Sequence, residues 1–173
     1  MAPQVPTVLP RRTDEERTRG ANPASIRTAR REDLGAIVAL LADDDLGRQR
    51  EAADSMTDPA YLRAFDQIDR DPRNELLVVD DEEGGVAATL QLTYVPSLTH
   101  RGGERAQVEG VRVASSHRGK GTGHLLLGWV VERTRERGCR MVQLTADKRR
   151  PDALRFYESL GFEATHEGMK LRL

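Results

Sequence analysis

One loop constrains the fold more than any other part of the chain: residues 118–123, Arg-Gly-Lys-Gly-Thr-Gly. The loop follows an alternating apolar stretch (106–113) that is typical of a strand, and it opens the amphipathic pattern of a helix (121–137). Glycines leave backbone N–H groups unobstructed by a Cβ atom, and the first turn of a helix adds unpaired N–H donors and the positive end of its dipole. The loop therefore predicts an anion site suited to a pyrophosphate.

Two well-known nucleotide-binding motifs do not match this loop. A P-loop requires Ser or Thr directly after the Lys of GxxxxGK, whereas Lys120 is followed by Gly121. A dinucleotide fingerprint requires GxGxxG, whereas these glycines are spaced GxGxG and His124 stands where the third glycine belongs. A loop that needs glycine only for tight packing is the alternative that the spacing leaves open.

The remaining patterns predict one mixed sheet covered by helices, an α/β (α+β) fold. Strands are predicted over 25–28, 76–79, 86–94, 106–113 and 141–146, with a hairpin-like pair over 162–173. Helices are predicted around 34–41, from Asp58-Pro59 onward, and over 121–137 and 152–160. Residues 25–173 are expected to form a single domain. Residues 1–24 lack apolar periodicity, which predicts a disordered tail.

Composition limits the partners of the chain. Lys and Arg total 27 against 28 for Asp and Glu, so the near-zero net charge of -1 predicts no general attraction to nucleic acid or to an anionic membrane. No apolar run could span a bilayer, and the N-terminal residues lack the apolar core of a signal peptide, so we expect a cytoplasmic protein. Cys139 is expected to be a small core residue, and the scattered histidines predict no metal site.

Two segments in register are similar to the motifs of the GNAT superfamily of N-acetyltransferases. The loop resembles the family's R-x-x-G-x-G signature, with Arg118, Gly121 and Gly123 in its defined positions. Residues 153–162, ALRFYESLGF, resemble the family's A-x-x-x-Y-E-x-x-G-F segment. The resemblance covers residues 25–173, although the motifs lie only in the second half. One position departs: many relatives carry an Asn seven residues before the Tyr, where it contacts the pantetheine arm, and this chain carries Arg150.

This resemblance implies a splayed sheet and an acetyl-CoA-dependent N-acyltransferase. The strands at 106–113 and 141–146 would part at one end, so that the pantetheine arm of acetyl-CoA enters the gap and pairs with strand backbone. The acetyl group would pass directly from the thioester to a primary amine. The residues implied in coenzyme binding are Val111, Arg112, Val113, Arg118, Gly119, Lys120, Gly121, Thr122 and Gly123.

Two residues are candidates for proton transfer. An aliphatic amine must lose a proton before it attacks, and Glu109, which alternation places on one strand face with Val111 and Val113, is the candidate base. A solvated or salt-bridged carboxylate is the alternative for Glu109. Tyr157 is the candidate acid for the departing thiolate. Spacing alone favours a core aromatic for Tyr157, whereas the family match favours the catalytic role.

The acceptor is not identified by the sequence. A small amine, an amino-acid-like compound, an antibiotic and a protein or peptide amine all stay open. Asp43, Asp44 and Asp45 could attract a cation, although such a run is usually a solvated face, and His100 and Arg101 could bind a carboxylate. Two other functions stay open: a non-catalytic acyl-CoA sensor or assembly domain, and an acyltransferase toxin on charged tRNA, for which a basic face would be expected. A homodimer is also compatible with the sequence.

Overall fold

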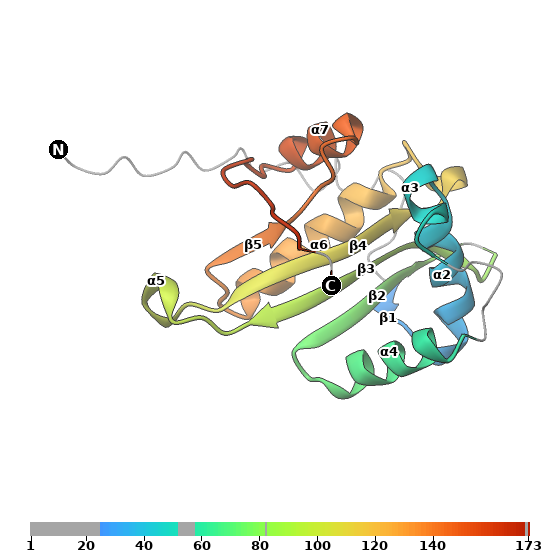
Figure 1. Cartoon of the computed structure of the whole chain (residues 1–173), viewed down its shortest axis with the longest axis horizontal. Coiled ribbons are helices and arrows are strands. Elements are labelled where there is room, and N and C mark those ends of the chain that lie inside the picture. The colour runs from blue at the N-terminus through green and yellow to red at the C-terminus, as the bar shows by residue number, and fades with distance from the viewer. Residues whose placement is uncertain (1–24, 52–57, 82, 172) are drawn as a thin grey trace.

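Five strands form one mixed sheet in the order β1-β2-β3-β4-β5 (Figure 1). The computed structural model describes residues 25–51, 58–81, 83–171 and 173, so the tail predicted at 1–24 lies outside the described residues. Neighbouring strands run antiparallel except for β4 and β5, which are parallel. The strands are β1 (Ile26–Thr28), β2 (Asn74–Asp80), β3 (Val86–Val95), β4 (Arg105–Val113) and β5 (Met141–Leu144). The predicted mixed sheet is confirmed.

Helices cover both faces of this sheet (Figure 1). On one face lie α2 (Leu34–Ala42), α3 (Asp45–Arg48) and α4 (Pro59–Arg70), and on the other lies α6 (Thr122–Glu136). The remaining helices are α5 (Thr99–Gly102) and α7 (Pro151–Ser159). The start of α4 agrees with the prediction from Asp58-Pro59. The Asp58 carboxylate accepts a hydrogen bond from the Ala60 N–H at 2.8 Å, and Pro59 occupies the first turn.

Two apolar cores lie on the two faces of the sheet. The larger core joins Leu90 and Leu92 of β3 to Leu126, Leu127 and Val130 of α6, all of which are fully buried. Burying each such side chain contributes about 1.5–3 kcal/mol. The smaller core holds α2 and α4 against the sheet, through Ile37, Val38, Phe65 and Val78. The sheet is thereby fixed from both sides.

The parallel pair β4 and β5 separates partway along β4. Pairing runs from Arg105 opposite Met141 to Val108 opposite Leu144, and there it stops, although β4 continues to Val113. Beyond Val108, the side of β4 that faces β5 has no paired strand among the described residues. This is the splay that the sequence motifs implied.

A bulge at Gly110 reverses the faces of the last residues of β4. Gly110 has a φ of 63°, in the left-handed region that favours glycine, and the register with β3 shifts there, since Gln91 pairs with Glu109 but Thr89 pairs with Arg112. The prediction that Glu109, Val111 and Val113 share one face is therefore wrong. Strict alternation fails at a bulge because one extra residue inverts every side chain that follows. Arg112 takes the face of Glu109.

The hairpin-like strand pair predicted at 162–173 is also wrong. No strand occurs within the described residues 162–171 and 173. Met169, Leu171 and Leu173 alternate as they would in a strand, but their side chains are exposed. Alternation predicts a strand only where the apolar face has a surface to cover. One local contact, an ion pair between Lys148 and Glu167, ties this segment to the turn after β5.

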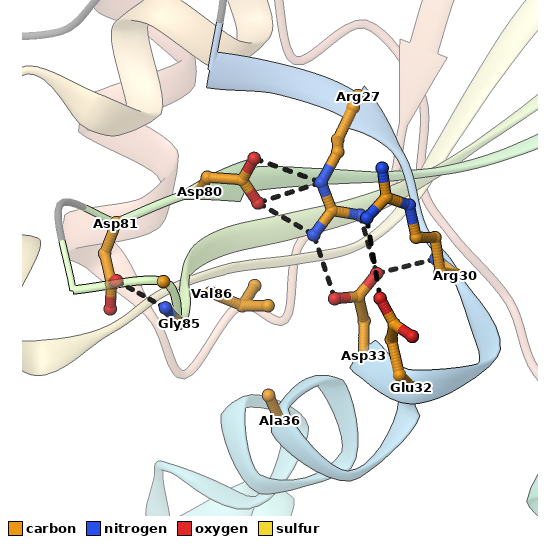
Figure 2. A pocket seen from close by; sticks show the side chains of 10 residues that line it. Arg27, Arg30, Glu32, Asp33, Ala36, Asp80, Asp81, Gly85 and Val86 are labelled. Atoms are coloured by element: carbon orange, nitrogen blue, oxygen red, sulfur yellow. Dashed lines mark hydrogen bonds and ion pairs between the residues drawn. The ribbon is translucent and has the colours of Figure 1, made fainter.

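A network of charged groups fixes the N-terminal end of α2 to the sheet. In Figure 2, the guanidinium of Arg27 lies between Asp33 and Asp80 at the edge of a polar pocket. Arg27 Nη1 donates to Asp33 at 2.7 Å and Arg27 Nε donates to Asp80 at 2.9 Å, while the Arg30 N–H donates to Asp33 at 2.6 Å. The hydrogen bonds from Arg27 lower the pKa of Asp33, against the opposing effect of burial. Asp33 therefore joins β1 to the start of α2.

Replacing Asp33 with Asn should destabilise the fold in a pH-dependent way. The pKa of Asp33 is lower in the folded than in the unfolded state. The ionised carboxylate therefore contributes its full share to the free energy of unfolding above about pH 4, and this share is lost as the pH falls through the folded-state pKa. We expect urea unfolding at pH 7 to show a loss of about 2–3 kcal/mol in the free energy of unfolding, and a smaller loss at pH 3. Glu32→Gln, at an exposed carboxylate, is the control and should change little. An equal loss at both pH values would contradict the ionic account.

Candidate active site

Two glycines of the 118–123 loop adopt backbone conformations that other residues avoid. Gly119 has a φ of 74° and Gly121, the N-cap of α6, has a φ of 86°. Both values lie in the left-handed region, where a Cβ atom would be strained. These turns bring the chain directly from β4 into the first turn of α6, whose N–H groups have no partner within the helix. The loop has the form of an anion cradle.

The other two small residues of the loop serve packing. A Cβ atom at Gly123 would lie 3.1 Å from Cζ of Phe156, so glycine lets α6 approach α7 closely. Thr122 is buried, and its hydroxyl donates to the His117 carbonyl at 3.4 Å. The packing alternative therefore holds for Gly123 but not for Gly119 or Gly121, and only the backbone of Thr122 is available to an anion.

The two cations of the loop differ in their surroundings. Arg118 Nε donates to the Val113 carbonyl at 3.0 Å, and its Nη2 donates to the Asp43 carboxylate at 2.7 Å. The guanidinium is thus held between the end of β4 and the turn after α2. Lys120 is exposed to solvent. Lys120 can therefore offer its charge to an anion at the loop, whereas the charge of Arg118 is paired with Asp43, and the loop backbone with Lys120 fits the pyrophosphate of the coenzyme that the motifs implied.

The predicted strand residues divide between the two faces of β4. Val111 and Val113 pack against the larger core, whereas Arg112 points to the face that α2 and α3 cover, where its Nε lies 3.5 Å from Asp44. Only the backbone of Val111 and Val113 can serve a ligand in the splay. Glu109 is exposed and is the first residue of β4 beyond its pairing with β5. A carboxylate is therefore accessible at the point where the strands part.

Tyr157 occupies a half-buried position on α7 among aromatic rings. Its ring centroid lies 5.3 Å from that of Phe156 and 5.9 Å from that of Phe162. Burial raises the pKa of the Tyr157 phenol, while the nearby positive charges of Arg112 and Arg150 act in the opposite direction. The phenol therefore keeps its proton at neutral pH, as a general acid must.

The sequence did not indicate the ion pairs that surround this site. Asp44 Oδ1 accepts from Arg150 Nη2 at 2.7 Å and from the Gly47 N–H at 2.7 Å, and its other oxygen faces Arg112. Burial would raise the pKa of Asp44, but the Gly47 hydrogen bond and the charges of Arg112 and Arg150 lower it. Asp43 and Asp44 are therefore ion-paired rather than a solvated face. These partners lie 75 and 106 residues apart, and no local pattern reports on such pairs.

Other sequence candidates lie away from the splay. His100 and Arg101 adopt positive φ values in α5, at the opposite end of β4 from Val113. Cys139 precedes β5 and packs against the larger core, where burial raises the pKa of its thiol, as expected of a core residue. Within the ranges that the structure describes, no helix is long and apolar enough to cross a membrane.

A sheet with a split parallel pair and a glycine loop at a helix N-terminus defines a class of acyl-CoA-binding fold, and comparison with known proteins identifies the family. The model of the acetyltransferase (GNAT) family matches residues 24–162. The chain belongs to this family, whose members use acetyl-CoA.

Two solved structures and one further protein are similar to this chain. A structure from Bacillus halodurans C-125, described as a transcriptional regulator, is 50% identical with a TM-score of 0.82, covering 86% of this chain and 98% of that one. An acetyltransferase structure from Trypanosoma brucei is 27% identical with a TM-score of 0.65, covering 86% and 98%. A glucosamine 6-phosphate N-acetyltransferase of Trypanosoma brucei brucei is 34% identical over 90 residues, or 52% of this chain and 59% of that protein. The last match thus spans less than two thirds of the relative.

Replacing Gly121 with Val should abolish acetyl-CoA binding, because a β-branched side chain is strained at this φ and would obstruct the cradle. Wild-type protein should bind acetyl-CoA in calorimetry with a Kd in the micromolar range or tighter, or about 8 kcal/mol. Gly128→Ala, at a glycine of α6 with open space around it, is the matched control and should bind as wild type does. A folded Gly121→Val protein with unchanged affinity would remove the loop from the coenzyme site.

Proposed function

We propose that this protein transfers the acetyl group of acetyl-CoA to a primary amine by direct attack on the thioester. The observation that carries the proposal is the end of β4–β5 pairing at Val108 and Leu144, which leaves the backbone of β4 open beside an exposed Glu109. The glycine loop begins a few residues further along the chain. One edge of β4 and one helix N-terminus thus offer donors to an extended ligand that ends in a pyrophosphate.

The coenzyme supplies an activated acetyl thioester, and the chain supplies the groups that bind it. The N–H groups at the start of α6, with Arg118 and Lys120, would hold the pyrophosphate. Backbone groups of Val111, Arg112 and Val113 would pair with the pantetheine arm at the place that a longer β5 would occupy. An N–H group in this stretch would also stabilise the negative charge that develops on the thioester oxygen.

Two side chains would move the protons. Glu109, acting through water, takes a proton from the ammonium form of the acceptor, which leaves a neutral amine to attack. A carbon–nitrogen bond then forms as the carbon–sulfur bond breaks, and Tyr157 donates its proton to the departing sulfur. A phenol near pKa 10 is a weaker acid than a thiol near 8.5, so this donation costs about 2 kcal/mol by itself, and loss of the second proton from the attacking nitrogen makes the overall step favourable. The nitrogen then loses its second proton, which restores the Tyr157 phenol through water, and the proton acquired by Glu109 returns to solvent.

A second candidate function is a non-catalytic regulator that binds acyl-CoA. The half-identical Bacillus halodurans protein is described as a transcriptional regulator, which is the specific observation in its favour. A sensor would need the glycine loop and the splay but not the exposed carboxylate of Glu109 or the phenol of Tyr157. Both residues are present in the chain, which favours the enzyme.

A thiol-release assay with a panel of amines separates the enzyme from the regulator. The panel includes amino sugars and their phosphates, because of the glucosamine 6-phosphate relative, together with amino acids and simple amines. We expect at least one amine to release coenzyme A, and Glu109→Gln to lower kcat about 10²–10⁴-fold near neutral pH. Glu158→Gln, at an exposed carboxylate on α7, is the control and should leave the rate unchanged. Tight coenzyme binding without turnover of any amine would favour the regulator.

Replacing Tyr157 with Phe should lower kcat about 10²–10⁴-fold with nearly unchanged coenzyme affinity, because the ring keeps its packing while the proton donor is lost. Tyr94→Phe is the matched control. The buried Tyr94 hydroxyl donates to Glu75 at 3.0 Å, so this variant should lose about 1–3 kcal/mol of stability but keep its kcat. If Tyr157→Phe keeps more than about a third of wild-type kcat when chemistry limits turnover, Tyr157 is not the acid.

A further inference from the structure

The guanidinium of Arg112 is buried without full use of its donors. Its side chain is 12% exposed, and its Nη1 donates to the neighbouring Val111 carbonyl at 2.8 Å. Among the described residues, Arg112 Nε is one of two buried side-chain nitrogens without a hydrogen-bond partner. The carboxylate of Asp44 lies 3.5 Å away, which is an ion pair but too long and poorly aligned for a good hydrogen bond. A buried cation of this kind calls for a closer anion.

A second guanidinium shares the same carboxylate. Arg150 Nη2 lies 2.7 Å from Asp44 Oδ1, and that oxygen also caps α3 through the Gly47 N–H. One carboxylate thus faces two arginines and a helix end. The charge of Arg50, which is ion-paired with Glu51 at 3.9 Å, also acts on Arg112. Arg150 and Asp44 are each 28% exposed, so a small solute can reach them from solvent.

These arginines lie beside the reacting groups rather than in the coenzyme loop. Because of the bulge at Gly110, Arg112 projects from the same face of β4 as Glu109. The two residues are three positions apart, which is about 10 Å or less along a strand. Tyr157 lies within the field of both Arg112 and Arg150. A small molecule whose amine meets Glu109 could therefore place a second group on the arginine pair.

We propose that Arg112 and Arg150 form a subsite for an anionic group, a phosphate or a carboxylate, carried by the amine acceptor, with Asp44 as the resident counter-ion that this group displaces. The inference rests on the proposed acetyltransferase function. Guanidinium groups match phosphate and carboxylate oxygens in bidentate geometry, and a phosphate offers three oxygens where Asp44 offers two, one of them already used by α3. The acceptor is thus a small amine with an anion within about 10 Å of its nitrogen.

Matched acceptors test the subsite through the reaction. Ethanolamine and O-phosphoethanolamine carry the same amine without and with a phosphate, and β-alanine carries a carboxylate. We expect wild-type kcat/KM to favour at least one of the two anionic amines over ethanolamine by at least about tenfold, or 1.4 kcal/mol. Arg150→Gln should reduce that preference to less than about threefold. Arg149→Gln, at an exposed neighbouring arginine, is the control and should keep the preference.

Binding of inorganic phosphate tests the subsite without turnover. In calorimetry on protein saturated with coenzyme A, which fills the glycine loop, phosphate should bind wild-type protein and the Arg149→Gln control but not Arg150→Gln. Asp44→Asn should bind phosphate several-fold more tightly, since Asn keeps the cap on α3 and removes the competing charge. A purely structural triad predicts the opposite sign for Asp44→Asn, because loss of Asp44 would then loosen both arginines.

The outcomes separate this inference from the proposed function. Turnover of amines with no preference for the anionic members, together with no Arg150-dependent phosphate binding, overturns the subsite and leaves the acetyltransferase intact. Arg150-dependent phosphate binding without turnover of any amine supports the anion subsite and contradicts the proposed acetyltransferase function. Weaker phosphate binding in Asp44→Asn than in wild type also overturns the role of Asp44 as a displaceable counter-ion.

Discussion

The separation of β5 from β4 after Val108 is the constraint on which the rest of the site depends. A strand edge left open within a sheet carries unpaired N–H and C=O groups, and these are costly unless water or a ligand meets them. Here the opening coincides with the bulge at Gly110, whose positive φ redirects the last residues of β4. The two features act together: the splay provides a backbone edge, and the bulge sends Val111 and Val113 into the core while Arg112 joins Glu109 on the opposite face.

Helix α2 is fixed at both of its ends by ion pairs. Asp33 precedes its first residue and binds Arg27. Asp43 and Asp44 follow its last residue and bind an arginine of the loop, an arginine of β4 and Arg150, which directly precedes α7. The turn after α2 is tight, since a Cβ atom at Gly47 would lie 2.1 Å from the Leu41 carbonyl oxygen. Leu41 in turn lies over Gly110, where an added Cβ would meet its side chain at 3.7 Å. The N-terminal half of the domain, which carries no family motif, therefore contributes one wall and the counter-charges of the site.

The sequence predicted the features that depend on neighbouring residues, such as glycine turns and a helix start. It did not predict the features that depend on strand register or on contacts between distant segments. Gly119 and Gly121 predicted the turns of the loop because few other residues adopt a left-handed backbone. Asp58 and Pro59 predicted the start of α4 because both act within its first turn. The faces of β4 were assigned wrongly, since a single glycine in a strand does not reveal a bulge to period-2 counting. Alternation at Met169, Leu171 and Leu173 predicted a strand for which the described residues provide no partner. The pairing of Asp43 with Arg118 and of Asp44 with Arg150 joins segments that only the tertiary fold brings together.

The ion pairs also bear on how Tyr157 keeps its proton. Burial raises the pKa of the phenol, and the charges of Arg112 and Arg150 counteract that rise, so a negative charge beside the arginines opposes their effect on the phenol. Asp44 supplies that charge when no acceptor is bound. If an acceptor anion displaced Asp44 from the arginines, it would supply a similar charge at a similar place. The field at Tyr157 would then be nearly the same before and after the acceptor binds, and the phenol would stay protonated until a thiolate forms beside it. A neutral acceptor would leave Asp44 in place and preserve the acid equally, so the subsite would select the acceptor through binding rather than through the acidity of Tyr157.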